Sequence, residues 1–491
     1  MNTPKRVLMV SSEYAPLAKS GGLADAVASL ATALRRNGVD LRVLIPRYGF
    51  IPKGKLELLP GSLGVPIGVR EEWVAVYRWE SQSGVPVYLI DHEELYGRTG
   101  IYNEEGLDYA DNPRRFALLS YSAFQLSRML HWIPEVIHAH DWPTGLVPVF
   151  LESRERQGEF EKTASLFTIH NIGYQGIFAP EQFIHTKLPW EDYERLGLSF
   201  EGSLNMLNGA LRNADVITTV SERYAEEIRT PEFSFGLHET LRRRDGPIYG
   251  VLNGIDLEEW NPEEDEYLPT PFSPEDPAGK KDAKLELQRQ MGLPEDPDTP
   301  LVGFVARLAE QKGIKYLFME GGGAMDRLCR EERIQCVVLA SGDPNYEELI
   351  RRSSLELPNL SAHLGYDNQL AHLIEGGADF LLMPSEYEPC GLNQMYSMRY
   401  GTIPIVSDTG GLADTVADES EGSRATGFII EGLTTDSVVA AVQRAVKIYR
   451  SQPERIEELR ATGMCRDFSW KRSALRYQEL YEEALRRRSR S

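Results

Sequence analysis

The stretch RVLMVSSEYAPLAKSGGLADAVASLATALRRNGVDLRVLIP occupies residues 6–46 and alternates apolar runs with an amphipathic segment. Its apolar start predicts a buried strand over residues 6–10. Apolar residues at helical spacing predict a helix over residues 24–37, and Gly38 is a typical residue to end it. A second apolar run predicts a strand over residues 41–45. A strand, a helix and a second strand in this order indicate a parallel sheet covered by helices, and hence an α/β fold.

The same alternation continues through the first half of the chain and restarts near residue 301. Ser221 follows one of the later strands and is a typical N-terminal cap for the helix behind it. Two such series predict two doubly wound domains that face a central cleft, with ligands bound beyond the carboxyl ends of the strands. The further predicted strands cover residues 136–139, 165–169, 216–220, 301–305, 336–340, 380–383 and 403–406.

The domain boundaries follow from shifts in composition. The predicted domains cover residues 1–250 and 251–467, and residues 468–491 form a C-terminal helical segment. Residues 261–300 are rich in proline and acidic residues, which predicts a surface excursion at the start of the second domain. The last helix is expected over residues 469–488, and its RRRSRS end is expected to be a solvated tail.

The composition excludes several classes of protein. Of the 491 residues, 42% are hydrophobic and 26% are charged, so the chain can bury real cores. Lys and Arg number 53 against 74 Asp and Glu, a net charge of −21 that argues against nucleic acids and anionic membranes as partners. No apolar run has the length of a membrane span or a secretory signal, so we expect a cytoplasmic enzyme. The cysteines are too scattered for a disulfide framework or a CxxC zinc site: Cys329, Cys336, Cys390 and Cys465.

A glycine pair opens the first predicted helix. Gly21 and Gly22 lack side chains, so an anion could approach the free N–H groups of the helix start, and Lys19 adds a full positive charge beside them. An ordinary turn between a strand and a helix would contain the same glycines, so the pair alone does not decide. The spacing matches neither a GxGxxG dinucleotide fingerprint nor a Walker loop, which argues against a dehydrogenase and a P-loop ATPase.

Two predicted strand ends in the first domain contain histidine. The motif HAHDW includes His140 and Asp141, and the motif HNIGYQG begins with His170 and Asn171. A single histidine is more often structural, but two histidine-bearing strand ends at one sheet edge favour a functional site. The sequence predicts no metal there, because no carboxylate cluster with ligand spacing accompanies the histidines.

The second domain contributes cations and a glutamate. Arg307 is expected to follow its strand, and with Lys312 it would make a pyrophosphate clamp, although solvated charge after a strand is also common. The motif PSEYEPCGLNQ includes Glu388 and is expected to open a helix near Gly391, which again offers N–H donors. The motif SDTGGL places a second glycine pair after a strand, over residues 407–412.

In family order, these motifs resemble those of bacterial and plant glycogen and starch synthases. The set is KSGGLADAV, HAHDW, HNIGYQG, NGID, RLAEQKG, SGDP, EYEPCGLNQ and DTGGL, and the resemblance extends from about residue 6 to residue 481. It implies a GT-B fold, with two Rossmann-like domains and a C-terminal helix that crosses back to the first. It also implies transfer of glucose from ADP-glucose to the non-reducing 4-hydroxyl of an α-1,4-glucan, with retention of configuration and without a metal or other cofactor.

The resemblance also implies roles for single residues. Lys19 and the turn of Gly21 and Gly22 would bind the donor from the first domain, the acceptor side. Arg307 and Lys312 would hold the donor diphosphate from the second domain, which would bind the nucleotide sugar.

The remaining implied roles concern the donor sugar and its phosphates. His170, with Asp141, would lie beside the donor glucose, and Glu388 would contact the sugar hydroxyls. The amides of Gly391 and Leu392 would meet phosphate. Further residues in the matching motifs are expected at the substrate site: Asp25, His140, Asn171, Asn253 near the hinge, Cys390 and Tyr396.

The chain departs from the family pattern at one position and supports a narrower assignment at another. Many members carry threonine or valine where this chain has Ser20, and we expect little effect. Related retaining transferases carry a second glutamate eight residues after the first, and here that position is Tyr396, as is usual in starch synthases.

Two alternatives remain open at this stage. One is a retaining transferase of the same fold that uses a UDP- or GDP-sugar. The other is a non-catalytic glucan-binding or priming protein, but such a protein would be expected to lose part of the charged set, which is complete here. A glycogen phosphorylase is disfavoured because no motif suggests its pyridoxal-phosphate lysine. The expected partners are therefore ADP-glucose and an α-1,4-glucan, with neither nucleic acid nor membrane.

Overall fold

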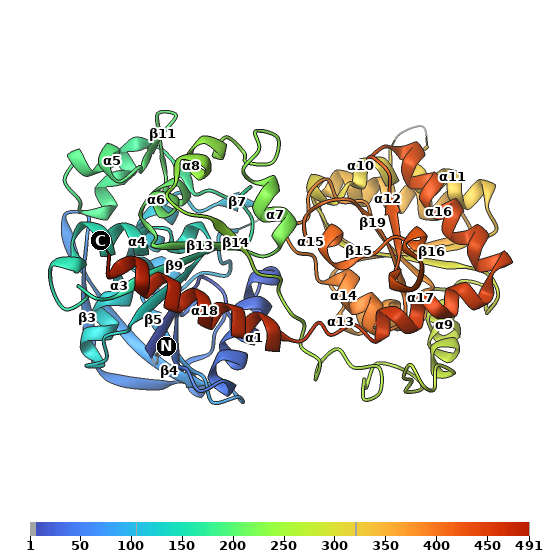
Figure 1. Cartoon of the computed structure of the whole chain (residues 1–491), viewed down its shortest axis with the longest axis horizontal. Coiled ribbons are helices and arrows are strands. Elements are labelled where there is room, and N and C mark those ends of the chain that lie inside the picture. The colour runs from blue at the N-terminus through green and yellow to red at the C-terminus, as the bar shows by residue number, and fades with distance from the viewer. Residues whose placement is uncertain (1–5, 105, 320–321, 491) are drawn as a thin grey trace. The chain divides into compact units, whose positions relative to one another are not determined.

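The computed structural model describes residues 6–104, 106–319 and 322–490 and divides into two compact units (Figure 1). The first unit contains the chain up to Gly254 and again from Trp470 onward, and the second unit runs from Ile255 to Ser469. The sequence placed these divisions a few residues earlier, at 250/251 and 467/468. Residues 1–5 belong to the N-terminal segment for which the sequence predicts no secretory signal, and they lie outside the described residues.

A mostly parallel sheet forms the centre of the first unit, with strand order β14-β13-β9-β8-β1-β2-β5-β4-β3. The strands β3 and β4 depart from the prediction, because they form an antiparallel hairpin that pairs with β5 at the edge. Its strands are β1 (Arg6–Val10), β2 (Asp40–Pro46), β3 (Glu57–Ile67), β4 (Arg70–Glu80), β5 (Pro86–Asp91), β8 (Val136–His140), β9 (Ala164–Ile169), β13 (Val216–Thr219) and β14 (Ile248–Gly250). Short strands outside it are β6 (Asn103–Glu104), β7 (Leu107–Asp108), β10 (Ile177–Phe178), β11 (Ser199–Phe200) and β12 (Ser203–Asn205).

Helices cover this sheet in two groups. The helix α1 packs on α18, which also contacts β8, β9 and β13, while α4 packs on both α3 and α6. The α-helices are α1 (Gly22–Arg36), α2 (Glu93–Tyr96), α3 (Asn112–Met129), α4 (Leu146–Ser153), α5 (Glu191–Arg195), α6 (Met206–Asn213), α7 (Glu222–Glu227), α8 (His238–Arg243) and α18 (Trp470–Arg488). Short 3₁₀ helices are η1 (Lys53–Lys55), η2 (Trp142–Thr144), η3 (Glu155–Gln157) and η4 (Pro180–Thr186).

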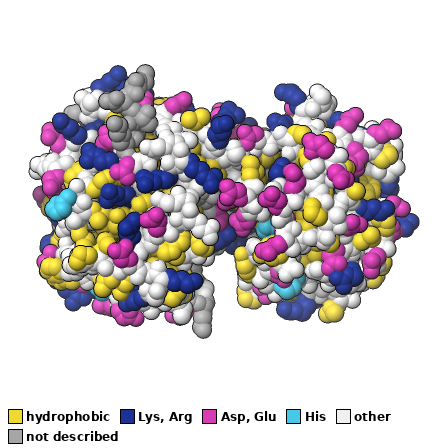
Figure 2. Space-filling view, turned by 90° about the horizontal axis from the view of Figure 1, so that it is seen from below, with side chains coloured by type: hydrophobic (Ala, Val, Ile, Leu, Met, Phe, Trp, Pro, Cys, Tyr) yellow, Lys and Arg dark blue, Asp and Glu magenta, His cyan; other side chains and the backbone are white. Residues whose placement is uncertain are grey.

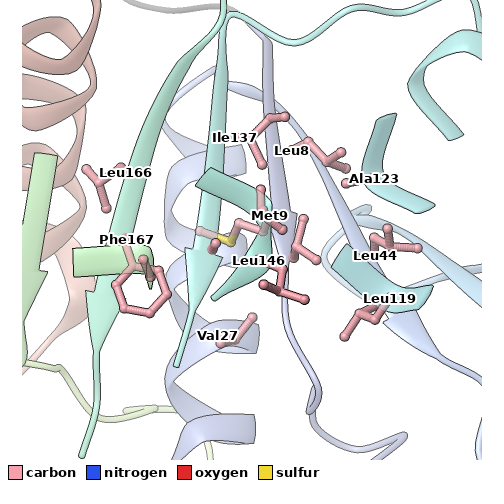
Figure 3. Close-up of a cluster of buried hydrophobic side chains, with 14 of the residues drawn as sticks. Leu8, Met9, Val27, Leu44, Leu119, Ala123, Ile137, Leu146, Leu166 and Phe167 are labelled. Atoms are coloured by element: carbon pink, nitrogen blue, oxygen red, sulfur yellow. The ribbon is translucent and has the colours of Figure 1, made fainter. Parts of the chain in front are cut away.

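The core of the first unit lies between the sheet and these helices. Alternate residues of a strand point to opposite faces, so the buried strands of a sheet covered on both sides are apolar throughout. Figure 3 shows this for neighbours on β1, β8 and β9, whose apolar side chains meet those of α1, α3 and α4. The labelled residues are Leu8, Met9, Val27, Leu44, Leu119, Ala123, Ile137, Leu146, Leu166 and Phe167.

A parallel sheet with order β17-β16-β15-β18-β19-β20 forms the centre of the second unit. Each strand predicted from the restarted alternation is present. The strands are β15 (Leu301–Leu308), β16 (Gln335–Gly342), β17 (Leu360–Leu364), β18 (Phe380–Met383), β19 (Ile403–Ser407) and β20 (Phe428–Ile430). The helices are α9 (Gly279–Gln290), α10 (Ile314–Leu317), α11 (Ala324–Glu331), α12 (Pro344–Glu356), α13 (Asn368–Gly377), α14 (Asn393–Arg399), α15 (Gly410–Thr415), α16 (Thr435–Ser451) and α17 (Pro453–Met464), with 3₁₀ helices η5 (Glu310–Lys312) and η6 (Glu419–Arg424).

The prediction that residues 261–300 form a surface excursion is wrong for the helix α9 within them. The buried ammonium of Lys280 donates hydrogen bonds to the carbonyls of Gly376 and Tyr400 and to the hydroxyl of Thr402, at 2.7–2.9 Å. The next turn of α9 places Lys284 2.6 Å from the carboxylate of Asp379. Charged residues therefore anchor α9 inside the unit, because each buried ammonium has oxygen partners.

The prediction of a solvated arginine tail is also only partly right. Arg487 donates hydrogen bonds to the main-chain carbonyls of Asp215 and Asp245, at 3.2 and 3.4 Å. Arg488 donates to the carbonyl of Glu161 at 2.8 Å. These arginines tie the end of α18 to loops of the first unit.

The surface carries charges of both signs. Figure 2 shows acidic and basic side chains interspersed on the face in view of each unit. Among the described residues, no helix is long and apolar enough to cross a membrane.

Candidate active site

The glycine turn of the first unit is held by a buried carboxylate that sequence analysis missed. Glu13 accepts hydrogen bonds from the main-chain N–H of Ser20 at 2.6 Å, from the Ser20 hydroxyl at 2.8 Å and from the N–H of Gly21 at 3.3 Å. The hydroxyl of Tyr102 donates to the same carboxylate at 2.6 Å. The expectation that the Gly21 amide is free for an anion is therefore wrong in this structure, because the Glu13 carboxylate already accepts from it.

Lys19 and Asp25, both predicted at the site, form an ion pair. The Lys19 ammonium lies 2.9 Å from an Asp25 carboxylate oxygen, and the lysine side chain is 44% exposed. Asp25 belongs to the first turn of α1, which begins at Gly22. An exposed pair of this kind is weak, so a dianionic ligand could attract the lysine away from Asp25.

The two histidine motifs meet at the carboxyl ends of β8 and β9. His140 Nδ1 lies 3.0 Å from His170 Nε2. His140 is almost fully buried, whereas His170 is partly exposed. Burial lowers the pKa of both imidazoles, that of His170 to about 3, so both are neutral near pH 7. The structure thus places the buried His140 directly behind the partly exposed His170. The substrate-site role of His140 stays a prediction.

Asp141 has a strained backbone and holds the start of the HNIGYQG loop. Its φ of 57° and ψ of 175° are rare for any residue with a side chain. Its carboxylate accepts hydrogen bonds from the N–H groups of His170 at 2.7 Å and Asn171 at 3.4 Å. Burial raises the pKa of Asp141 to about 7, against the opposing effect of these two N–H donors. The amide oxygen of Asn171 in turn accepts from the N–H of Gly173 at 2.9 Å, so the loop is fixed by local hydrogen bonds.

In the second unit, Arg307 lies on a strand and not after it. The strand β15 continues to Leu308, and Arg307 pairs with Ser341 of β16. The Arg307 side chain is exposed, whereas the next residue of the strand, Leu308, is buried. The prediction that the strand ends before Arg307 is therefore wrong, although the arginine still lies at the carboxyl end of the strand.

Lys312 and Glu388 contact each other directly. Lys312 ends η5, and its ammonium forms an ion pair with Oε2 of the buried Glu388. The Ser385 hydroxyl donates to the same oxygen at 3.0 Å. Gly313 follows in the left-handed region, with φ of 68°, where an added Cβ would overlap the Pro384 carbonyl. This close approach brings the RLAEQKG and EYEPCG motifs together.

The second glycine pair supports the EYEPCG loop and does not offer a free turn. The N–H of Gly411 donates to the carbonyl of Glu388 at 3.0 Å. An added Cβ at Gly410 would overlap that carbonyl, and one at Gly411 would overlap the carbonyl of Cys390. Glycine is required at both positions because any side chain would collide with the main chain of the EYEPCG loop.

The helix after Glu388 begins later than predicted. Cys390 is buried, and Gly391 has a φ of 70°. The helix α14 begins at Asn393 with Leu392 as its cap residue, two residues later than predicted.

Tyr396 lies in an aromatic stack that has no signature in the sequence. The ring of Trp260 is stacked 3.8 Å from Tyr396 on one side and 3.9 Å from His372 on the other. The stack joins the segment after the unit boundary to α13 and α14. Asn253, expected near a hinge, is buried two residues before that boundary.

Within the described residues, no group of three or more His, Cys, Asp or Glu side chains is arranged to hold a metal ion.

Comparison with known proteins identifies the family. Residues 6–243 match the family described as "Starch synthase catalytic domain", and residues 288–461 match "Glycosyl transferases group 1". The chain is 44% identical to the glycogen synthase of Treponema denticola, over 99% of both chains. It is also 44% identical to that of Anaeromyxobacter sp., over 97% of this chain and 98% of the other. The chain belongs to the glycogen and starch synthase family.

A solved structure supports the fold assignment for this glycogen and starch synthase family member. The catalytic domain of starch synthase IV from Arabidopsis thaliana, bound to ADP and acarbose, matches with a TM-score of 0.90 and 31% identity over 99% of this chain and 100% of that one. The predicted GT-B class with two Rossmann-like α/β domains is confirmed. The predicted enzyme class is confirmed too: this family member is a glycosyltransferase that acts as a glycogen or starch synthase.

Proposed function

We propose that this glycosyltransferase transfers glucose from ADP-glucose to the non-reducing end of an α-1,4-glucan, with retention of configuration and without a metal ion. The observation that carries the proposal is the direct contact of Lys312 with Glu388 in the loops beyond the carboxyl ends of β15 and β18, with Arg307 at the carboxyl end of β15. The Arabidopsis starch synthase with ADP and acarbose bound supports the nature of both ligands. A cytoplasmic location stays a prediction from the sequence.

The chemistry of the donor explains why cations are needed. Breaking the bond between glucose and ADP leaves negative charge on the departing diphosphate. Positive groups placed where that charge develops lower the barrier, and they replace a metal ion in this role. Arg307 is exposed at its strand end, and Lys312 can reach a phosphate by leaving Glu388. Lys19 of the first unit stays a predicted donor-binding residue.

Glu388 has a different task from the cations. Once Lys312 turns to the diphosphate, the Glu388 carboxylate can accept hydrogen bonds from sugar hydroxyls, while Ser385 still holds one of its oxygens. In a retaining transfer the departing phosphate can accept the acceptor proton on the same face of the sugar. Glu388 is therefore a substrate-positioning group in the proposal, and no base of an inverting reaction is needed.

A coupled assay tests the proposal. The enzyme is incubated with glycogen and either ADP-glucose or UDP-glucose, and release of the nucleoside diphosphate is measured, with Glu388→Gln as the control variant. We expect faster turnover with ADP-glucose. Turnover only with UDP-glucose would contradict the donor assignment, and glycogen binding without turnover of any nucleotide sugar would support the alternative of a glucan-binding protein.

Two further arms test the finer claims. Activity should persist in EDTA, and complete loss with rescue by Mg²⁺ would overturn metal independence. The extended product should be fully digested by an α-1,4-specific amylase. A product that resists this amylase but is cut by a β-specific glucanase would refute retention.

A further inference from the structure

A row of buried polar groups connects the C-terminal helix to His170 in the first unit. The hydroxyl of Tyr481 on α18 lies 2.9 Å from His138 Nδ1, and the hydroxyl of Thr168 lies 2.7 Å from His138 Nε2. The ring of His138 packs against that of His140, with 4.0 Å between centroids and 32° between the ring planes. His140 Nδ1 then meets His170 Nε2 at 3.0 Å. Each link is a direct contact, so the orientation of one ring constrains the next.

His138 is the fixed end of this row. Both of its ring nitrogens have hydroxyl partners, so its ring cannot turn without breaking a buried hydrogen bond. The Thr168 hydroxyl is itself 2.7 Å from that of Thr218 on β13. His138 and His140 are two residues apart on β8 and therefore project from the same face of the strand. The fixed ring of His138 thus packs against the ring of His140 and limits how it can turn.

The other nitrogen of His140 decides which tautomer the histidine pair adopts. His140 Nε2 is buried and has no hydrogen-bond partner among the described residues. A buried N–H without a partner is rarer in proteins than a buried lone pair without a donor. His140 is therefore favoured with its hydrogen on Nδ1, from where it donates to His170 Nε2. His170 Nε2 is then an acceptor, and the hydrogen of a neutral His170 lies on Nδ1.

We propose that His140 is a positioning residue that holds His170 as the Nδ1–H tautomer, and that His138, fixed by Tyr481 and Thr168, holds His140. The partly exposed edge of His170 then presents an N–H donor to a ligand oxygen. That this oxygen belongs to the donor sugar rests on the proposed function, whereas the tautomer does not. Because burial keeps all three imidazoles neutral, the position of the hydrogen and not the charge is what the row controls.

Nitrogen NMR of the ligand-free enzyme labelled at histidine tests the tautomer directly. The two nitrogens of a neutral imidazole have different shifts, and the signals are assigned by substituting each histidine in turn. We expect His170 to carry its hydrogen on Nδ1. In His140→Leu, which removes the donor at similar size, this signature is lost. In His140→Asn, whose amide nitrogen can occupy the position of Nδ1, it is retained. A His170 with its hydrogen on Nε2 in the wild type overturns the proposal.

Kinetics test whether the tautomer matters for turnover. His140→Leu should lower kcat about tenfold or more, in line with other cases where a group that orients a histidine is lost, while the KM for glycogen stays nearly unchanged. His140→Asn should recover most of the loss. Equal kcat for His140→Leu and the wild type overturns the positioning role, and so does equal loss in both variants.

Two variants of α18 test the end of the row that is farthest from His170, where Tyr481 contacts His138. Tyr481→Phe should lower kcat, whereas Ser473→Ala, which removes a hydrogen bond from the same helix to the Leu252 carbonyl, should not. Equal loss in both variants would assign the effect to undocking of α18 and overturn the role of Tyr481. If the wild type shows the predicted tautomer but turns over no nucleotide sugar, the proposed function fails and the tautomer assignment stands.

Discussion

The ammonium of Lys312 is paired with the carboxylate of Glu388 within the second unit, and the Ser385 hydroxyl donates to the same glutamate oxygen. The family resemblance implied that these two residues bind different parts of the donor, Lys312 the diphosphate and Glu388 the sugar. In this structure they neutralise each other. In the proposed function the donor supplies new partners to both, and the shared contact predicts a measurable coupling between the two residues.

Replacing Glu388 by glutamine should lower kcat by at least about 100-fold, because an amide is a weaker acceptor for sugar hydroxyls than a carboxylate. The measurement is a double-mutant cycle with Lys312→Met, using steady-state rates of nucleoside diphosphate release. We expect the two effects to be non-additive, since the residues share a contact. Near-normal kcat in Glu388→Gln would remove this residue from the active site.

Lys19→Ala should raise the KM for the nucleotide sugar about 10- to 100-fold, the usual effect of losing one charge-assisted hydrogen bond. The matched control is Asp25→Asn, which removes the ion-pair partner but keeps the lysine. That variant should bind the donor as well as the wild type or better, because Lys19 no longer has to leave Asp25. Unchanged KM and kcat in Lys19→Ala would show that the lysine has no donor-binding role.

Asp141 should give the protein a pH dependence of a definite sign. Its pKa is about 7 when folded and near 3.8 when unfolded, so between these values the folded state holds the extra proton. The contribution of Asp141 to stability is therefore present in full below pH 4 and falls as the pH rises towards 7. In Asp141→Asn this loss is absent, so Tm of the variant minus Tm of the wild type should grow from pH 4 to pH 8. A constant difference in calorimetry would contradict the raised pKa.

Gly411→Ala should destabilise the second unit by about 1–3 kcal/mol, because the added methyl group overlaps the Cys390 carbonyl in a packed loop. It should also lower kcat, since the loop positions Glu388. Gly54→Ala is the control: a Cβ there meets no atom within 4 Å, and its effect should stay within about 0.5 kcal/mol. Wild-type activity and Tm in Gly411→Ala would show that the loop adapts without moving Glu388.

Nine strands of the two sheets were predictable because they are short apolar runs with clear ends: β1, β2, β8, β9, β13, β15, β16, β18 and β19. The parallel strands β5, β14, β17 and β20 were not predicted. Residues 380–383 were predicted with the bounds of β18, and the strand over residues 216–220 was one residue too long. The hairpin of β3 and β4 was missed because its strands are partly exposed and carry charged residues. The helix α9 was missed because its prolines and acidic neighbours indicate a surface, while Lys280 and Lys284 find their oxygen partners only in the folded unit.

The candidate site was predictable as a set of motifs but not as a set of contacts. Lys19, His170, Arg307, Lys312 and Glu388 all lie at strand ends or in the loops that follow, where the topology predicts them. The buried carboxylate of Glu13 was missed because SSEYAP carries no motif of its own. The stack of Trp260 on Tyr396 was missed because its partners are far apart in the chain. Such pairings depend on tertiary packing, which local patterns do not encode.

The position of α18 after the second unit in the chain sets an order of events during synthesis. The ribosome completes all other elements of the first unit before it makes the second, and α18 emerges only afterwards. At roughly 5–20 residues per second, this interval is on the order of ten to forty seconds. Throughout it, the apolar surface that Tyr477, Leu480 and Tyr481 cover in the finished protein is open to chaperones or to other nascent chains. The second unit is continuous in sequence, so its synthesis contains no such interval. The first unit is therefore begun before the second unit but completed after it.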